Sequence, residues 1–586
     1  MHRVFDASCR LMLHPPAYAS LGELLSDALV QWKRETALVE MDRLRLTHAW
    51  TYRETKVEVM RVARWLAQLD LAPGTRVAIL MSNQSRWLVA ACALFRRGLV
   101  LVPIDYKLSE SEQLALLAHA EVSVLVVEHA LAKRFGKAPS VRHVLVSDAP
   151  EGSAGQRWEA LPSDDDADDP ALVSRTRDDA ACIVYSSGTG GTPKGCVLTH
   201  DAYLEQLLAL MEIFPMRPGH RTFSVLPTNH AIDFMVGFLG PFACGAAVVH
   251  QRTLRPEFLV STMREQKITH IALVPVLLEA FERALDEKLD ERPAWQRAAV
   301  EGLSAINFAL TRSKADPALS RRLLGGVHAA FGGHLELLFA GGAFVDRERA
   351  ERFYRLGLPV VIGYGLTECC TVATVNDLRP FRADSVGRPV SGVEIRIDSP
   401  GADGIGEVWI RGRTVMKEYF REPELTAKAI TDEGWLRTGD LGSLDASEHL
   451  RLVGRSKNMI VTAGGKNVYP EDVEGALEGS PAEELAVFAS GYVWPRSRTL
   501  TDEILFAVAR AKPSESRAIA KWLADRNRRL PEHKRLAAVL VVGDAFPRTA
   551  SMKLKRDVLA EHLRGAHSEA DLVMLASASL SVEARP

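Results

Sequence analysis

The segment YSSGTGGTPKGCVLTH, residues 185–200, follows the apolar run ACIV and combines four glycines, several hydroxyl side chains and Lys194. A strand that runs into such a loop exposes backbone N–H groups, and small residues let phosphate oxygens approach them closely. The lysine adds a positive charge beside those donors. The segment therefore predicts a phosphate-binding loop that follows a buried strand.

Two common nucleotide-binding patterns do not fit this loop. The P-loop requires G-x-x-x-x-G-K-[ST], whereas here Pro193 precedes Lys194 and Gly195 follows it. The dinucleotide pattern G-x-G-x-x-G is also missing, because GYGLTE at residues 363–368 ends in an acid. The sequence therefore predicts neither a P-loop nucleotidase nor a dinucleotide-binding fold.

Short apolar runs alternate with helical patterns along most of the chain. Examples are RVAIL, then the helical segment SRWLVAACALFRRG, then LVLVPI, and later HIALVP and LELLFAGG. Apolar strands separated by amphipathic helices indicate parallel sheets, because the crossover helices cover both faces. We therefore predict an α/β fold.

The length of 586 residues predicts at least two domains, because a single core stops growing near roughly 250–300 residues. Near Gly454 the pattern changes: EVWIRG and HLRLVGR indicate antiparallel hairpin strands, and PEDVEGALEG then begins a helix with a proline and two acids. We predict a large domain of parallel-rich sheets and flanking helices over residues 1–454. A small, mobile α+β domain is expected over 455–565, and a weakly ordered tail over 566–586.

Composition restricts the partners and the compartment. The formal net charge of −2 gives no excess of basic residues to neutralise nucleic acid, so no nucleic-acid partner is expected. Seven cysteines without a CxxC pair argue against a disulfide framework or a zinc site and favour a cytoplasmic location. No signal-peptide pattern and no apolar run of roughly 20 residues occurs. We expect a soluble protein without a transmembrane segment, and peripheral membrane contact stays open.

Five motifs occur in the order found in the adenylate-forming superfamily, which the chain resembles over nearly its whole length. This superfamily includes acyl-CoA synthetases, the adenylation domains of peptide synthetases and firefly luciferase. The resemblance implies an enzyme that uses ATP and Mg²⁺ to convert a carboxylic acid to acyl-AMP, releases pyrophosphate, and transfers the acyl group to the thiol of coenzyme A. The motifs are the loop above, GYGLTE, GWLRTGDLG (434–442), GRSKNMIVTAGGKNVYPEDVE (454–474) and PRTASMKLKR (547–556).

The resemblance implies roles for residues of the ATP site. Glu368 would hold Mg²⁺ between the phosphates, and Thr367 would reach the α-phosphate. Tyr364, next to Gly365, would stack on adenine. Two further groups complete the nucleotide site: the phosphate loop Ser186, Ser187, Gly188, Thr189, Gly190, Gly191, Thr192 and Lys194, and the adenine segment Gly341, Gly342 and Ala343.

The later motifs imply a ribose site, a hinge and a second half-reaction. Asp440 and Arg455 would bind the ribose hydroxyls, and Lys457 occupies the hinge position, about which the smaller domain rotates. Gly464 and Gly465 would border the passage for the pantetheine thiol.

The C-terminal motif implies the catalytic lysine. Lys553 falls on the lysine that contacts the carboxylate and the bridging oxygen during adenylation, and Lys555 is close enough in sequence to compete for the role. Two departures from the family pattern stand out: Gly190 replaces a usual threonine and Met552 replaces a glycine. A non-catalytic homologue that only binds nucleotide therefore stays an alternative.

The acyl group is predicted from two segments. LPTNHAIDFMVGFLGP resembles the substrate-facing motif of acyl-CoA synthetases, with His230 at the pocket position and Asp233 in an otherwise apolar stretch, either meeting substrate or capping a helix. The helical insertion at residues 284–333 resembles the long-chain fatty acyl-CoA synthetase branch. A medium- or long-chain fatty acid is therefore expected. The alternatives are a fatty acyl-AMP ligase that loads an acyl or peptidyl carrier protein, and an enzyme that activates aryl or amino acids.

Overall fold

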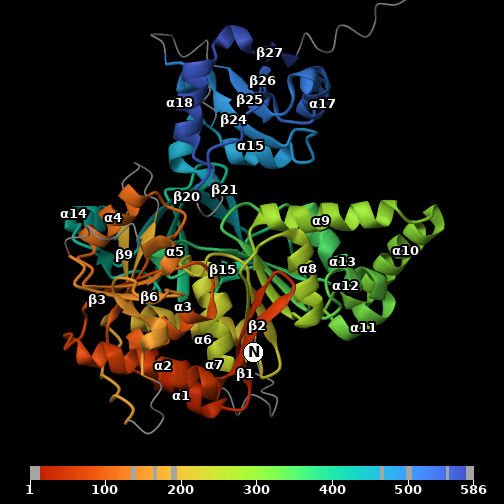
Figure 1. The fold of residues 1–586 in the computed structure, drawn as a ribbon. Helices are drawn as coiled ribbons and strands as arrows, with labels where there is room; N and C mark the ends of the chain where they lie inside the picture. Colours follow the sequence, from red (N-terminus) through yellow and green to blue (C-terminus); the bar gives the residue numbers. More distant parts are fainter. Residues whose placement is uncertain are drawn as a thin grey trace, which may run out of the picture. The chain divides into compact units, whose positions relative to one another are not determined.

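The computed structural model describes residues 13–132, 140–162, 168–186, 194–214, 216–461, 467–495, 504–549 and 554–575 (Figure 1). The chain forms two compact units. Unit 1 comprises Met1–Arg396 and Trp409–Arg437, and unit 2 comprises Ile397–Val408 and Thr438–Pro586. Mixed α/β architecture is present in both, so the predicted fold class is confirmed.

Unit 1 contains a nine-stranded sheet whose inner strands are parallel and whose outermost pairs are antiparallel. The predicted strands HIALVP and LELLFAGG are neighbours in it, and the run PVVIGYG forms the next strand. In spatial order the strands are β16 (Arg388–Pro389), β15 (Thr374–Val375), β14 (Val360–Tyr364), β13 (Leu337–Gly341), β12 (His270–Leu273), β10 (Arg221–Ser224), β11 (Ala247–Gln251), β1 (Thr36–Asp42) and β2 (Arg45–Thr51).

An eight-stranded sheet completes the frame of unit 1, and it carries the two ends of the glycine-rich loop. Six strands are parallel, and the last two at one edge are antiparallel. In order they are β19 (Glu418–Tyr419), β9 (Lys194–Thr199), β8 (Ala180–Ser186), β4 (Val100–Pro103), β3 (Arg76–Leu80), β5 (Val124–Glu128), β6 (His143–Ser147) and β7 (Gln156–Arg157).

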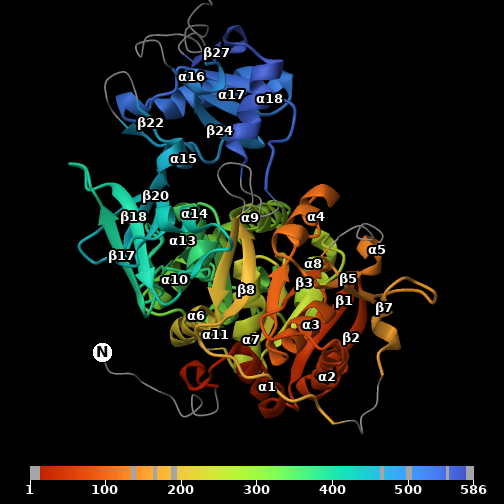
Figure 2. The ribbon, with the colours of Figure 1, turned by 90° about the vertical axis from the view of Figure 1, so that its left-hand side faces the viewer.

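Helix α3 (Ser85–Arg96) lies between the two sheets, because it contacts β3 and β4 of one and β1 of the other. Its sequence SRWLVAACALFR is apolar on nearly every side, as expected of a helix that is buried all round. Figure 2 shows it behind the eight-stranded sheet. The other helices of this half are α1 (Leu21–Gln31), α2 (Tyr52–Gln68), α4 (Glu110–His119), α5 (His129–Ala132), α6 (His200–Ile213), α7 (Gly240–Cys244) and α8 (Pro256–Glu265).

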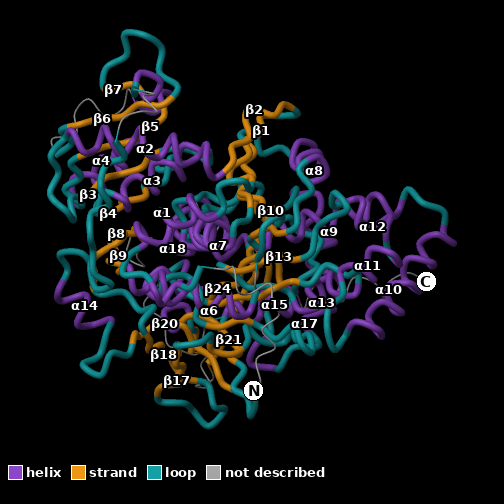
Figure 3. The backbone as a smooth tube through the Cα atoms, turned by 90° about the horizontal axis from the view of Figure 1, so that it is seen from below, coloured by secondary structure: helices purple, strands orange, loops and turns teal. Residues whose placement is uncertain are grey.

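The predicted helical insertion is confirmed as a group of helices at one edge of unit 1 (Figure 1). Figure 3 shows α10 and α11 beyond the strand-rich part of the unit. The helices are α9 (Pro275–Asp290), α10 (Ala294–Thr311), α11 (Pro317–Leu323) and α12 (Gly325–Ala330), followed by α13 (Arg347–Arg355) and, later in the chain, α14 (Pro423–Ala429).

A four-stranded sheet has the order β17 (Val393–Asp398), β18 (Gly406–Gly412), β20 (Leu436–Leu444) and β21 (Leu450–Arg455). The runs EVWIRG and HLRLVGR are both strands of this sheet, β18 and β21, as predicted, but they are not direct neighbours. β20, which contains the TGD triplet, lies between the two runs and is the antiparallel partner of β21. The intervening segment of more than thirty residues allowed that extra strand to insert.

Unit 2 also contains a sheet in the order β24 (Glu484–Ala489), β25 (Leu505–Arg510), β26 (Ala538–Val542) and β27 (Val573–Met574), and a short pair, β22 (Ile460–Val461) with β23 (Asn467–Val468). Alternate residues of β24 and β25 enter two separate apolar clusters, one on each face. The helices are α15 (Pro470–Ala476), as predicted, α16 (Ser490–Val493), α17 (Ser516–Asn527) and α18 (Arg556–Ala566). Among the described residues of the whole chain, no helix is long and apolar enough to cross a membrane.

Candidate functional site

The ends of the glycine-rich loop are held opposite each other by strands β8 and β9. These strands pair antiparallel, and the last pair in their register is Ser186 with Lys194. The loop therefore leaves and re-enters the sheet at one point on its edge. Residues 187–193 lie outside the described residues, so the roles of Ser187, Gly188, Thr189, Gly190, Gly191 and Thr192 stay predictions.

Glu368 lies beside this point. It belongs to the 3₁₀ turn Thr367–Cys369, which contacts β8 and β9. Its Oε1 accepts hydrogen bonds from Ser186 Oγ at 3.3 Å and from Tyr419 Oη at 3.0 Å. Lys194 Nζ lies 5.1 Å from the centre of the Tyr419 ring. The structure thus brings together three sequence-predicted residues that occur far apart in the chain.

Tyr419 is a site residue that sequence reasoning missed. It lies on the two-residue strand β19, which pairs with β9 opposite Cys196, directly beside the loop's exit. The surrounding sequence, KEYF, carries no motif. Only the sheet register places its hydroxyl on Glu368, so a pattern search had no signal to find it.

The adenine-binding residues predicted from the sequence lie at the carboxyl ends of neighbouring parallel strands, where open α/β sheets bind ligands. Gly341 ends β13 and pairs with Gly363 of β14, and Tyr364 ends β14 with 7% of its surface exposed. Gly342 and Ala343 follow Gly341 and are exposed.

Gly365 is required by a close backbone approach in the same region. A Cβ atom at this position would lie 2.0 Å from the carbonyl oxygen of Thr371, so any side chain would force the backbone apart. The turn is closed by Thr371 N–H donating to Leu366 O at 3.2 Å, which brings the chain back beside Glu368. The glycine therefore shapes the turn that begins at Tyr364 and contains Thr367.

His230 forms an ion pair with a carboxylate that the sequence did not single out. Its Nε2 lies 3.4 Å from Asp105 Oδ2, and Asp105 is 6% exposed. Burial raises the pKa of Asp105, but hydrogen bonding and charge from His230 and the backbone N–H of Lys107 outweigh it and lower the pKa overall. The pair fixes one side of the histidine ring within unit 1.

Asp233 is completely buried at the start of the π-helical turn η4 (Asp233–Leu239). Its Oδ2 accepts hydrogen bonds from Ser224 Oγ at 2.7 Å and Thr228 Oγ1 at 3.0 Å, while Oδ1 has no partner within the described part of the chain. Burial raises the pKa of Asp233 to about 7, although the two hydroxyls lower it in part. Its observed partners are these two side-chain hydroxyls.

A narrow apolar cavity of about 20 Å³ follows on from this turn. Three elements of unit 1 form it: helix α6 and the segment after it, the turn η4 with α7, and strand β13. The side chains and backbone that line it belong to Leu207, Leu210, Met211, Phe214, Met216, Met235, Val236, Gly240, Cys244 and Phe339.

The predicted ribose-binding residues lie in unit 2. Asp440 on β20 stands opposite Arg455 on β21, and the Arg455 Nε donates to the Asp440 carboxylate. Asp440 is 7% exposed, and its backbone N–H donates to Thr438 Oγ1 at 3.0 Å. The pair is therefore preformed within unit 2.

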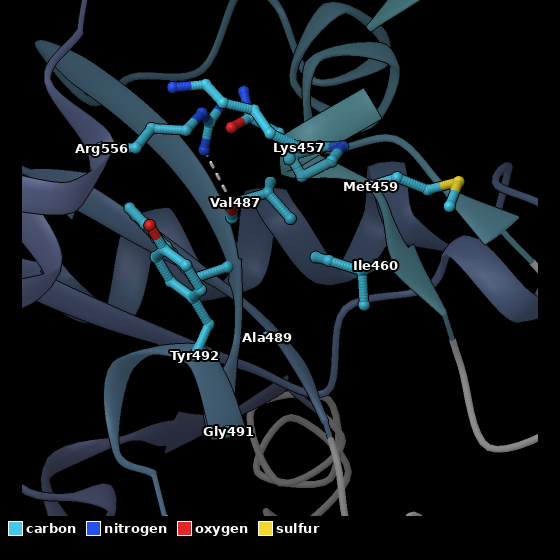
Figure 4. Close-up of a pocket in the computed structure, with 11 residues that line it drawn as sticks. Lys457, Met459, Ile460, Val487, Ala489, Gly491, Tyr492 and Arg556 are labelled. Atoms are coloured by element: carbon cyan, nitrogen blue, oxygen red, sulfur yellow. Dashed lines mark hydrogen bonds between the residues drawn. The ribbon is translucent and has the colours of Figure 1, made fainter. Parts of the chain in front are cut away.

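A pocket of about 290 Å³ lies in unit 2 next to Lys457 (Figure 4). In Figure 4, Arg556 donates to the carbonyl of Val487, and Tyr492, Ile460 and Met459 surround the opening. Lys457 is the one residue with a sequence-predicted role that lines it.

Three sequence-predicted residues of unit 2, Gly464, Gly465 and Lys553, lie outside the described residues, as does Met552. Their roles stay predictions. Lys555 is described, and its backbone N–H donates to Pro547 O at 2.8 Å. This bond closes the base of the segment that contains Lys553. Within the described ranges no group of three or more His, Cys, Asp or Glu residues could hold a metal ion alone.

Comparison with known proteins is consistent across sequence and structure. Residues 25–420 match the family described as AMP-binding enzyme. The long-chain-fatty-acid–CoA ligase FadD15 of Mycobacterium bovis is 31% identical over 75% of this chain and 74% of the ligase. A feruloyl-CoA synthase of an Amycolatopsis species is 28% identical over 74% of this chain and 79% of the synthase. The fold of ATP-bound MatB from Rhodopseudomonas palustris superposes with a TM-score of 0.73 at 23% identity, covering 93% of this chain and 100% of MatB.

Proposed function

Because the chain belongs to the AMP-binding enzyme family and is an acyl-CoA synthetase, we propose that it activates a medium- or long-chain fatty acid with ATP and Mg²⁺ and transfers the acyl group to coenzyme A. The observation that carries the ATP half of this proposal is the contact of Ser186, Glu368 and Tyr419 beside Lys194. The end of the loop at Ser186, the carboxylate of Glu368 and the ammonium group of Lys194 are close enough together to contact one polyphosphate chain.

A carboxylate is a poor acyl donor, so it must first gain a leaving group. In the proposed reaction the acid's carboxylate oxygen attacks the α-phosphorus of ATP, the bond to the bridging oxygen breaks, and pyrophosphate leaves. Lys194, and Lys553 from the C-terminal motif, would neutralise the negative charge that grows in the transition state. The coenzyme A thiol then attacks the acyl carbonyl, AMP leaves with the bonding electrons, and the thiol proton passes to solvent.

The residues present fit a magnesium ion bound together with nucleotide. Mg²⁺ is usually held by one or two carboxylates plus substrate phosphates, and it keeps several waters. Glu368 is a carboxylate beside the end of the predicted phosphate loop, and Ser186 and Tyr419 fix one of its oxygens. When bound, the ion would supply charge neutralisation at the phosphates.

The apolar lining of the cavity favours a fatty acyl chain over a short polar acid, and because its 20 Å³ have room for about one water-sized group, the lining side chains would have to move to admit a chain. Its lining carries no charged side chain, and three of its members, Met211, Met216 and Met235, are unbranched and adapt their shape readily. The turn that begins three residues after His230 contributes Met235 and Val236 to the cavity lining. One continuous segment would therefore contact both the carboxyl end and the acyl chain of the substrate. The relatives differ in the acids that their names give, so the acyl class is a proposal for this chain.

An acid panel tests the activity and the acyl class together. AMP formation would be measured with fatty acids of 6 to 18 carbons, roughly the range that a pocket of this kind distinguishes methylene by methylene, and with ferulate and benzoate, each with and without coenzyme A. We expect the highest kcat/KM for a medium- or long-chain acid. Faster turnover of the aryl acids would overturn the acyl class. Adenylation that never yields thioester with coenzyme A would favour a carrier-protein acceptor.

A substitution pair tests the cavity. Met211→Trp should fill the space and shift the optimum to shorter acids, because the added volume removes room for methylene groups. Ile213→Trp is the matched control, since Ile213 lies on the same helix with 41% of its surface exposed and does not line the cavity. Equal chain-length profiles for the two variants would remove this cavity from the acyl site.

We also propose that the protein works in the cytoplasm. All six cysteines within the described residues are buried thiols, which is consistent with a reducing compartment. For Lys457 we keep the proposed role of hinge for the smaller domain. Because its side chain is exposed, its backbone torsions can change without loss of packing contacts.

A further inference from the structure

Helix α10 of the insertion packs Val300 and Leu303 inward against the apolar core and has apolar side chains on its outer face as well. Trp295 is 71% exposed, Ile306 51% and Leu310 61%. Between them Ala298, Ala299, Gly302, Ala305 and Ala309 are also exposed, and together with the three large residues they form an apolar face; Arg297 and Glu301 are exposed outside it. We call these eight residues the α10 stripe.

The inward side of the same helix is partly polar. Asn307 and Thr311 are buried there: Asn307 Nδ2 donates to Arg355 O at 3.0 Å, and Tyr354 Oη donates to Thr311 O at 2.6 Å. A surface helix normally has polar and charged residues on its outer face. An outer face that is apolar as well indicates that the stripe is covered when the protein functions.

The stripe is symmetric about Gly302. Positions 299 and 305 lie three residues from the glycine, 298 and 306 lie four residues from it, and 295 and 309 lie seven residues from it. Leu310 extends the stripe at one end. If two copies of α10 pair antiparallel with Gly302 on the two-fold axis, Trp295 meets Ala309 of the other copy and Ile306 meets Ala298. Each large side chain therefore faces a small one, as well-packed interfaces require.

Gly302 itself fits close contact between two helices. A glycine inside a helix destabilises it by about 0.5–1 kcal/mol relative to alanine. A Cβ at this position would meet nothing within 4 Å in one copy of the chain, so packing inside the molecule does not require the glycine. Close approach of a second backbone would explain it.

The charges around the stripe favour a protein partner over a lipid surface. Within the helix only Arg297 and Glu301 are charged, and Arg297 pairs with Asp290 at 3.1 Å. Over residues 290–314 three acids, Asp290, Glu291 and Glu301, stand against four bases, Arg292, Arg297, Arg312 and Lys314, a difference of one. Anionic membranes attract clusters of four to eight unopposed bases.

We propose that α10 is a self-association surface, through which two copies of this chain pair as antiparallel helices with Gly302 on the two-fold axis. One helix face is smaller than the roughly 800 Å² per partner that a standard stable interface buries. Association is therefore reversible and depends on concentration. Self-association through α10 does not depend on any step of the proposed reaction. Either proposal can therefore be refuted without affecting the other.

Sedimentation equilibrium of the full chain tests the pairing. Dimer should form with rising concentration, and Ile306→Glu should weaken it by at least tenfold, because the charge would be buried against Ala298 of the second copy. The matched control is Val30→Glu, since Val30 lies on helix α1 with 57% exposure and outside the stripe. A chain that stays monomeric, or equal weakening by both variants, would overturn the proposal.

Cysteine cross-linking tests the geometry. In a Cys9→Ser background, Gly302→Cys should form a disulfide-linked dimer on mild oxidation, because only a residue on the axis meets its own copy. Trp295→Cys and Ala309→Cys should each fail alone and cross-link when mixed, since 14 residues of helix separate each cysteine from its own copy by about 21 Å. Cross-linking of Trp295→Cys with itself would show parallel pairing and refute the two-fold arrangement. Sedimentation of the wild-type chain with phosphatidylcholine vesicles, lost in Ile306→Glu while the chain stays monomeric, would assign the stripe to membranes instead.

Discussion

The Glu368 carboxylate accepts a hydrogen bond from the Tyr419 hydroxyl at 3.0 Å, and Tyr419 also presents its ring to Lys194. One aromatic side chain thus contacts both the carboxylate proposed for Mg²⁺ and the cation proposed for phosphate. The tyrosine links two charges of opposite sign without neutralising either.

Tyr419→Phe should therefore lower adenylation while keeping the ring beside Lys194. The lost bond donates to a charged group, so a cost of about 1.5–3 kcal/mol is expected if it persists in the transition state. Pyrophosphate exchange at several Mg²⁺ concentrations would measure it. We expect a raised Mg²⁺ requirement, and an unchanged Mg²⁺ dependence would separate Tyr419 from the metal.

Lys194→Ala and Glu368→Ala should each reduce the adenylation rate more strongly. Preorganised charges at a developing anion typically contribute about 2–4 kcal/mol. Single-turnover formation of acyl-AMP would report the chemical step, and ATP binding would be measured separately. Normal turnover by Glu368→Ala would contradict its proposed role, whatever the effect at Lys194.

The two half-reactions should separate in the C-terminal motifs. Lys553→Ala should abolish acyl-AMP formation but still convert supplied acyl-AMP to thioester, and Lys555→Ala should impair neither. A bulky residue at Gly465 should give the reverse pattern, because it would obstruct the thiol and leave the phosphate site intact. If Lys555→Ala failed in adenylation and Lys553→Ala did not, Met552 would have shifted the motif by two residues.

Asp233→Asn should change how stability depends on pH. Burial raises the pKa of Asp233 from its usual 3.8 to about 7, so the folded state binds more protons than the unfolded state between these values. The contribution of Asp233 to the free energy of unfolding is full below pH 4, falls as pH rises toward 7 and is constant above. The loss is up to about 4 kcal/mol, from roughly three units at 1.36 kcal/mol each.

Buried histidines also change the free energy of unfolding in this pH range, but their contribution increases with pH instead of decreasing. Burial lowers the pKa of His200 to about 4 and that of His250 to about 3, so their contribution is full above pH 6.5 and falls as pH decreases. Denaturant unfolding of wild type and Asp233→Asn at each pH isolates the aspartate, because the histidine terms cancel in the difference. A difference that did not vary between pH 4 and 7 would contradict the assignment.

The sequence predicted much of the frame because the periodic signals were strong. RVAIL became β3 with the same ends, and the apolar segment 85–98 became the fully enclosed helix α3. The partner of HLRLVGR could not be predicted, because strand order in an antiparallel sheet depends on which segment returns between two runs, and local patterns carry no such information. Gly341 and Tyr364 lie at strand ends, where ligands bind in open α/β sheets, and their roles in binding adenine stay predictions.

Partners supplied by tertiary structure could not be predicted. Asp105, which pairs with His230, occurs in PIDYK without any motif, and Tyr419 reaches Glu368 only through sheet register. The environment of Asp233 depends equally on hydroxyls at positions 224 and 228 that come together only after folding. Sequence motifs therefore identify residues with proposed chemical roles more readily than the residues that orient them.

The position of β19 in the chain has a consequence for protein synthesis. β19 covers the edge of β9, yet it is translated more than 200 residues later, after the chain has already contributed Ile397–Val408 to the other unit. Until then β9 is an unpaired edge, which invites pairing with other chains. A nascent chain that stalls near Arg396 should therefore aggregate or recruit a chaperone, whereas one released beyond Arg437 should not. Ribosome-bound intermediates of these two lengths, probed by limited proteolysis, would show when unit 1 becomes complete.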